Sequence, residues 1–320
     1  MLTPEQKNIR MTGVGASEVS AIVGLNPYRG ALDVWCSKPT PSRPPFFESS
    51  EDPDGLTPMA VGEELERGLL SLLTRRIKVE FVMPRITMRH PSAPHVLASP
   101  DGVARKKRGA EIKVVGSRMV HHWGESGTAD VPDYVLTQCA QNMAVLGAEV
   151  WFVGALINGN DFRTYTIERD LVLEDGLVDA VEDFWRDHVE TDEPPDSEDP
   201  DERRRYLLAR YPGSEKTACR LVEDGEIAAH VARYRELTAA IEAAEAEKSA
   251  REVAICEAIG ESYGIEGRWG KAIWYRRNGN VRWNDVAEEL AGGVLPPAVT
   301  EKHRGNPSRV FRIYAPKKGR

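Results

Sequence analysis

SPDGVARKKRGAEIKVV, residues 99–115, is the stretch that decides the fold. β-like runs stand on either side of the basic segment Arg105–Gly109, which separates them as a hairpin turn does. The pattern therefore predicts neighbouring strands at 96–104 and 110–115. The other predicted elements surround this hairpin in the sequence.

Three charged residues of the hairpin are candidates for chemistry. Asp101 and Glu111 come close across neighbouring strands, and Glu111 and Lys113 share one face because side chains alternate along a strand. Burying this set is costly unless a cation offsets the charge, and carboxylate oxygens suit Mg²⁺ or Mn²⁺. Such a metal polarises a phosphate, while Lys113 orients or activates a bound water. An exposed hairpin with a surface Glu–Lys pair fits the loose D-x9-E-x-K pattern equally well.

Helices and further strands surround the hairpin, which indicates an α/β fold with a mixed central sheet flanked by helices. Predicted helices lie at 17–25, 59–73, 132–146 and 171–188. Predicted strands lie at 79–83, 85–90, 149–157 and 163–169, the last two around the turn Asn158-Gly159-Asn160. The Pro-rich, acidic segment 39–58 is predicted to be an exposed loop.

The C-terminal third has a different composition. We predict a core at 1–190, an acidic, Pro-containing linker at 191–205, and a helical arm with a small, basic β extension at 206–320. Residues 226–259 are predicted to form a long amphipathic helix, or a helix folded back as a helical hairpin. Aromatic and basic residues alternate after it, which suits either DNA contacts or a small β core; they are Arg268, Trp269, Lys271, Trp274, Tyr275, Arg276, Arg277, Arg282 and Trp283.

Composition limits the class of protein. The chain has 320 residues, 41% apolar and 29% charged, with neither an 18-residue apolar run nor a signal-peptide h-region. Four dispersed cysteines (Cys36, Cys139, Cys219 and Cys256) disfavour zinc, iron–sulfur and disulfide frameworks and suit a cytoplasmic location. The net charge is −8, but 14 acidic residues stand between Glu174 and Glu202, and the last twenty residues carry seven basic ones. A polyanionic partner therefore remains compatible with the charge.

Four blocks together resemble the YqaJ-like phage recombinases, relatives of lambda exonuclease among the PD-(D/E)xK nucleases. Pro100-Asp101 with Glu111-Ile112-Lys113 resembles the core motif, and Gly62 to Glu66 resembles the G-x-x-x-E of the preceding helix. Residues 13–35, GVGASEVSAIVGLNPYRGALDVW, are similar to the opening block, and Pro132, Tyr134 and Gln138 to the glutamine helix. The resemblance runs from about Arg10 to Asp170 and implies a restriction-endonuclease-like sheet.

The resemblance implies roles for individual residues. Asp101, Glu111, Glu66 and the Ile112 backbone carbonyl would hold Mg²⁺, with Mn²⁺ as an alternative, and Gln138 would fix Lys113 or a metal-bound water. Glu66 and Gln138 are otherwise an ordinary carboxylate and amide on helix surfaces.

Arg10 and Ser17 match the family's pocket for a 5′-terminal phosphate. Ser17 stands where a glycine-containing turn enters a helix, and arginine adds a permanently charged donor. Taken alone, Ser17 is a plain N-cap serine.

By resemblance, the protein is a 5′→3′ exonuclease on double-stranded DNA ends that leaves 3′ single strands for recombination. The resemblance also implies a ring-like homo-oligomer, a single-strand annealing partner and, for a phage protein, the host cytoplasm. The alternatives are an endonuclease or nickase with the same chemistry, and a non-catalytic DNA-binding assembly protein.

Overall fold

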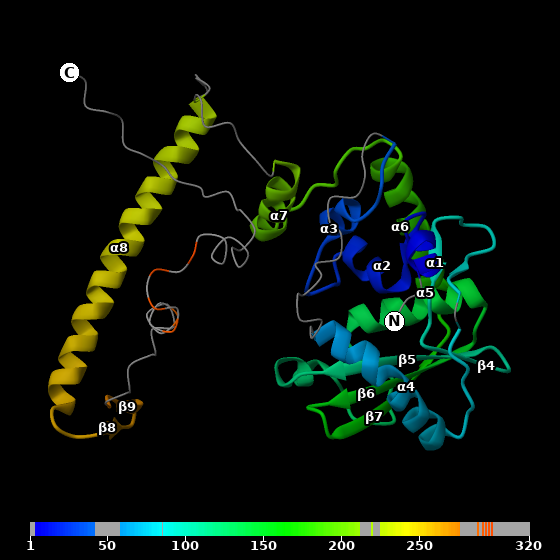
Figure 1. Ribbon diagram of the computed structural model, residues 1–320, viewed down its shortest axis with the longest axis horizontal. Coiled ribbons are helices and arrows are strands. Elements are labelled where there is room, and N and C mark those ends of the chain that lie inside the picture. Colours follow the sequence, from blue (N-terminus) through cyan, green and yellow to red (C-terminus); the bar gives the residue numbers. More distant parts are fainter. Residues whose placement is uncertain are drawn as a thin grey trace. The chain divides into compact units, whose positions relative to one another are not determined.

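The computed structural model describes residues 4–41, 58–84, 86–211 and 225–275, together with isolated positions at 219 and beyond 286. The chain divides into two compact units, Met1–Pro212 and Gly213–Arg320 (Figure 1). All the predicted site residues lie in the first unit.

The first unit is built from helices and short strands. Its helices are α1 Pro4–Arg10, α2 Ala16–Ile22, α3 Ala31–Cys36, α4 Pro58–Ile77, α5 Asp133–Leu146, α6 Leu171–Phe184 and α7 Pro200–Arg210, with a 3₁₀ turn η1 Ser117–His122 and a π turn η2 Trp185–Val189. Its strands are β1 Val14–Gly15, β2 Met88–Arg89, β3 Val96–Ala98, β4 Gly102–Ala104, β5 Arg108–Val115, β6 Val150–Ile157 and β7 Asp161–Glu168.

The larger sheet has the strand order β4-β5-β6-β7. It is mixed, because β5 and β6 run parallel while the two outer pairs are antiparallel. A smaller sheet has the order β1-β3-β2, in which β1 runs parallel to β3 and β2 runs antiparallel to it. The predicted α/β class, a mixed sheet flanked by helices, is confirmed.

Helices cover both faces of the larger sheet (Figure 1). On one face, Leu69 and Leu73 of α4 pack with Ala110 and Ile112 of β5. On the other face α5 packs against β5, β6 and β7, and α2 and α6 pack in turn against α5. Side chains alternate along β5, and those of Ala110 and Ile112 face α4. The side chains of Glu111 and Lys113 therefore face α5 on the opposite side of the sheet.

Local signals place several elements correctly. The β6–β7 hairpin turns at Asn158 and Gly159, the central residues of a turn in which Asn160 N donates to Ile157 O at 3.2 Å, and both have positive φ (50° and 77°). Helix α5 ends at Gly147 with φ 61°, the left-handed C-cap that favours glycine. Helices α4, α5 and α6 also lie where the apolar spacing predicts them.

Two strand predictions are wrong in extent. Residues 79–83 contribute a single β-bridge, Val82 to Val103, in place of a strand. The predicted strand 96–104 is broken at Ser99–Asp101 into β3 and β4, which belong to different sheets. Pro100 has no N–H for a ladder, so the chain bends there and Asp101 lies in the bend.

Helix α7, which begins within the acidic segment 191–205, packs against other parts of the first unit. Glu202 of α7 is only 4% exposed and accepts a hydrogen bond from Asp33 N at 2.9 Å. Arg205 pairs with the Asp33 carboxylate at 2.6 Å, and Tyr206 packs edge-on against Trp35. The division between the compact units therefore falls later, after Pro212.

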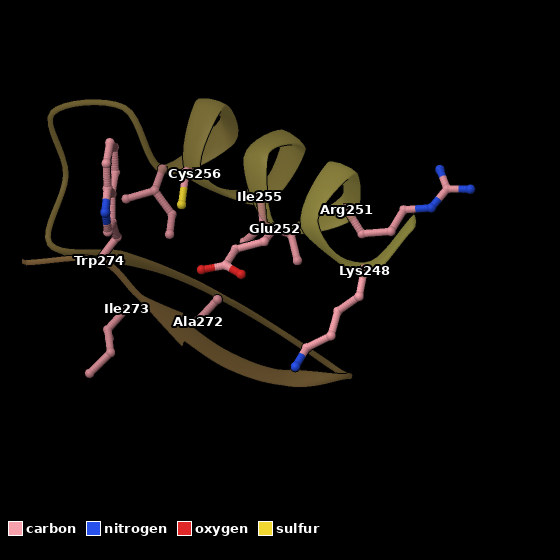
Figure 2. A pocket seen from close by; sticks show the side chains of 9 residues that line it. Lys248, Arg251, Glu252, Ile255, Cys256, Ala272, Ile273 and Trp274 are labelled. Atoms are coloured by element: carbon pink, nitrogen blue, oxygen red, sulfur yellow. The ribbon is translucent and has the colours of Figure 1, made fainter. Parts of the chain in front are cut away.

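The second unit contains α8 Gly225–Ile259 and the antiparallel hairpin β8 Gly264–Gly267 and β9 Gly270–Ile273. Helix α8 is one continuous helix, which confirms the long helix predicted at 226–259 and not its alternative, a helical hairpin. A cavity of about 320 Å³ lies between the last turns of α8 and the hairpin (Figure 2). Its lining includes the apolar residues Ile255, Ile259, Ile273 and Trp274 and the charged residues Lys248, Arg251 and Glu252. Described aromatic residues after α8 are largely exposed rather than forming a core; they are Tyr263, Trp269, Trp274 and Tyr275.

Some predicted features lie outside the described residues: most of the loop 39–58, the residues Arg276, Arg277, Arg282 and Trp283, and the basic tail 302–320. Among the described helices, none is both long and apolar enough to cross a membrane.

Candidate active site

The charged residues of β5 meet an amide from α5. Lys113 Nζ donates to Glu111 Oε1 at 2.6 Å and to Gln138 Oε1 at 2.8 Å. Gln138 Nε2 donates to the same Glu111 oxygen at 2.6 Å. The three side chains thus form a closed triangle between strand and helix, in which Glu111 is only 2% exposed. Gln138 is therefore buried in a network and not an amide on a helix surface.

Asp101 reaches the same place from the bend between β3 and β4. Its Oδ2 accepts a hydrogen bond from Ile112 N at 2.6 Å, which fixes the carboxylate beside β5 and next to Glu111. Burial raises the pKa of Asp101 well above its usual value, and the charges of Glu111 and Glu66 raise it further. Carboxylates thus converge here, as the hairpin predicts, although Asp101 lies in a bend and not on a strand.

Glu66 on α4 lies within electrostatic reach of these acids. Burial raises the pKa of Glu66, and the nearby charges of Glu111 and Glu63 act in the same direction. Within the described part of the chain, however, no three His, Cys, Asp or Glu side chains are grouped closely enough to form a metal cluster. The structure therefore brings Asp101, Glu111, Lys113 and Gln138 together and leaves Glu66 at their margin.

The donor chemistry of the site fits a hard divalent cation. Glu111 Oε2 is buried and has no hydrogen-bond partner among the described residues. A buried carboxylate oxygen without a partner is costly, and a cation bound there would satisfy it. Oxygen donors from Asp101 and Glu111 are those that Mg²⁺ and Mn²⁺ prefer.

Lys113 is a cation in this arrangement. Burial alone would lower its pKa, but Glu111 and Asp101 outweigh burial and hold the pKa above the ordinary lysine value. Such a lysine donates hydrogen bonds and stabilises negative charge.

A second cluster forms around the start of α2. Arg10 Nη2 donates to Ser17 Oγ at 3.0 Å, so the structure brings together the two residues that the sequence pairs. The N-cap of α2 is Gly15 and Ser17 lies inside the first turn, which makes the reading of Ser17 as a plain N-cap wrong. A Cβ atom at Gly15 would lie 2.9 Å from Arg10 Nη2. The guanidinium therefore lies over the helix start only because residue 15 has no side chain.

Sequence reasoning missed the residue at the centre of this cluster, Glu18. Its Oε2 accepts from Gly15 N at 2.7 Å and from Lys38 Nζ at 2.8 Å. Guanidinium nitrogens of Arg10 and Arg29 lie 3.8 and 3.6 Å from the same carboxylate. The spacing Gly15-x-x-Glu18, a capping-box pattern, was the available signal.

We call Arg10, Arg29 and Lys38 around Glu18 the cation cluster. Burial alone would raise the pKa of Glu18, but Lys38 and the two arginines lower it to about 2. Burial lowers the pKa of Lys38, although the charge of Glu18 acts in the opposite direction. Lys38 Nζ also donates to Arg10 O at 3.1 Å, and this hydrogen bond favours an ionised Lys38–Glu18 pair. Three cations then face one carboxylate, and the excess positive charge favours an anion.

Helix α5 connects the two clusters. One turn after Gln138, the side-chain amide of Gln141 donates to Val14 O and to Leu97 O, each at 2.9 Å. Val14 leads directly into the cation cluster, and Leu97 precedes the bend that carries Asp101. One helix therefore holds both clusters in place.

Comparison with known proteins agrees with the motifs. Residues 5–149 match the model of the YqaJ-like viral recombinase domain. The uncharacterized protein YqaJ of Bacillus subtilis (strain 168) is 27% identical over 209 residues, which cover 64% of this chain and 62% of that protein. The match thus spans less than two thirds of the relative's length.

Two solved structures whose descriptions name exonucleases show a limited similarity to this chain. An alkaline exonuclease (LHK-Exo) from Laribacter hongkongensis has 18% identity and a TM-score of 0.45, over 58% of this chain and 92% of that one. A phage-related exonuclease from Haemophilus somnus 129PT has 13% identity and a TM-score of 0.37, over 57% of this chain and 96% of that one. The likeness to the YqaJ-like viral recombinase domain therefore rests on the match over residues 5–149 and on the motifs within it.

Proposed function

We propose that this protein is a divalent-metal-dependent deoxyribonuclease that degrades double-stranded DNA from its 5′ ends and leaves 3′ single strands for recombination. The observation that carries the proposal is the Glu111–Lys113–Gln138 triangle beside Asp101, in which one buried Glu111 oxygen has no hydrogen-bond partner among the described residues. The YqaJ-like domain supports the same chemistry.

Asp101, Glu111 and the Ile112 backbone carbonyl would hold Mg²⁺ or Mn²⁺, with Glu66 contributing from α4. When bound, the cation supplies charge to the phosphate and lowers the pKa of a coordinated water. The chain's own residues orient the reaction. Lys113, held as a cation, stabilises negative charge that develops on the phosphate, and Gln138 fixes both the ammonium and the Glu111 carboxylate.

The cation cluster would give the protein a preference for the ends of double-stranded DNA. Arg10 and Ser17 would bind the 5′-terminal phosphate, a group with up to two negative charges that a duplex carries only at its ends. An endonuclease needs no such site. The excess of cations over Glu18 favours the exonuclease over the endonuclease alternative.

The test is digestion of linear duplexes with 5′-phosphate, 5′-hydroxyl or blocked 5′ ends, with and without Mg²⁺ or Mn²⁺. We expect metal-dependent loss of the 5′ strand, fastest from phosphorylated ends. Cleavage of closed circular DNA at a similar rate would support the endonuclease, and DNA binding without cleavage would support an assembly protein.

A ring-like oligomer and a single-strand annealing partner also belong to the proposal. Light scattering of the full chain would measure the first, and co-purification with a candidate annealing protein the second.

A further inference from the structure

Tyr28 is an exposed aromatic residue held in a defined place. It lies in the loop between α2 and α3, its side chain is 63% exposed, and its ring meets that of Tyr134 edge-on, with centroids 6.0 Å apart and planes at 79°. Tyr134 lies on α5, one turn before Gln138. An aromatic side chain with so much free surface contributes little to a core.

The loop fixes the backbone beneath this ring. Asn26 Oδ1 accepts hydrogen bonds from Tyr28 N at 2.9 Å and from Arg29 N at 3.3 Å. The Asn26 amide donates to Ser20 Oγ on α2 at 3.0 Å. The position of Tyr28 is therefore set by an Asx turn tied to a helix, so little conformational entropy remains to be lost on binding.

Tyr28 is connected to both clusters of the site. On one side, its neighbour Arg29 reaches Glu18 in the cation cluster. On the other side, its ring contacts Tyr134, which lies on α5 one turn before Gln138 of the triangle. The exposed ring of Tyr28 thus has a chain neighbour in the cation cluster and a ring partner one turn from the triangle.

We propose that Tyr28, backed by Tyr134, is the stacking platform for an unpaired nucleobase at the end of the strand whose terminal phosphate enters the cation cluster. Aromatic rings take any base in this way, because every base has a π face, so the platform holds an end without reading its sequence. This inference rests on the proposed function and adds to it the recognition of an unpaired base.

The experiment measures stacking without cleavage. An Asp101→Asn background binds duplexes with a three-nucleotide unpaired 5′ end whose terminal base is 2-aminopurine, and fluorescence quenching reports stacking. Tyr28→Ala should abolish the quenching and weaken binding about tenfold, while Tyr28→Phe should keep both. Tyr211→Ala, at another exposed tyrosine of the first unit, is the matched control and should change neither.

A second measurement uses the full chain with Asp101 intact. The wild type should digest a duplex with a normal 5′-terminal nucleotide several-fold faster than one with an abasic terminal nucleotide, and Tyr28→Ala should lose this difference. Thermal unfolding of each variant confirms that the fold is kept.

The outcomes separate this inference from the proposed function. Quenching and base preference that survive in Tyr28→Ala overturn the platform, as does a Tyr28→Phe variant as defective as Tyr28→Ala, or a chain that binds no DNA. A wild type that binds and quenches but cleaves no DNA overturns the nuclease and leaves the platform standing.

Discussion

Glu111 and Lys113 stand two residues apart on β5, and their charged ends are 2.6 Å apart. This ion pair uses one Glu111 oxygen and leaves the other buried without a partner among the described residues. The pair therefore keeps Lys113 charged and keeps one carboxylate oxygen available to a cation.

Glu111→Gln should remove this arrangement while preserving side-chain volume. We expect the Mg²⁺-dependent cleavage rate to fall by at least about a hundredfold, because the amide supplies neither the charge nor the free anionic oxygen. Single-turnover cleavage and calorimetric Mg²⁺ binding check the prediction. Near-wild-type rates in a folded Glu111→Gln protein would remove Glu111 from the catalytic site, and the same holds for Asp101→Ala and Lys113→Ala.

Glu66 has a matched control on its own helix. Glu66→Gln should weaken metal-dependent cleavage about tenfold or more, since Glu66 is close enough to Asp101 for their charges to interact. Glu64→Gln, at an exposed position of α4, should leave the rate unchanged. Equal rates in the two variants would show that Glu66 does not contribute to the metal site and is an ordinary carboxylate on the helix surface.

Gly15→Ala should displace the Arg10 side chain without changing residue 10 itself. The added methyl group would occupy the place of the guanidinium, which can swing away because it ends a flexible side chain. We expect both Gly15→Ala and Arg10→Ala to reduce the rate from 5′-phosphorylated ends by roughly ten- to a hundredfold, the value of a charged hydrogen bond, with little change in general duplex binding. Unchanged phosphate-to-hydroxyl rate ratios in both variants would show that the phosphate binds elsewhere.

Glu18 should make stability depend on pH in the acid range. Its pKa in the folded chain, about 2, lies below the ordinary 4.5, so its stabilising effect is complete above 4.5 and is lost as pH falls toward 2. The effect is on the order of 3 kcal/mol. Chemical denaturation should show a difference between wild type and Glu18→Gln that shrinks from pH 5 to pH 2. A difference independent of pH would mean that the Glu18 charge is not held by the cation cluster.

Truncation should distinguish the acidic segment from a linker. A chain ending at Tyr211 keeps α7 and should fold with an intact metal site. A chain ending at Glu190 loses Glu202, Arg205 and Tyr206 from the surface around Asp33 and Trp35, and should unfold at a lower temperature. Equal melting temperatures would show that α7 contributes nothing to the first unit.

The sequence predicted what depends on local pattern. Alternation along 110–115 put Glu111 and Lys113 on one face, and turn residues located the β6–β7 hairpin. The pairing of Gln138 with β5 came from a resemblance, because no periodicity shows which strand a helix amide meets. Glu18 was missed for a similar reason: its partners Arg29 and Lys38 meet it only after the chain folds back. Composition also did not predict the packing of α7 at the end of the acidic segment. That packing depends on a hydrogen bond from the backbone N–H of Asp33 to the Glu202 carboxylate, which only the folded chain brings together.

The hydrogen bonds from Gln141 to Val14 and Leu97 have a consequence for the number of nucleotides in each released product. In the proposed reaction, the number of nucleotides released in each cycle is the spacing between the held terminus and the bond that is cut. Gln141 joins the backbones leading to both points, and Gln138 on the same helix holds the triangle. In the proposed reaction, the packing of helix α5 would therefore set the distance between the held terminus and the bond that is cut.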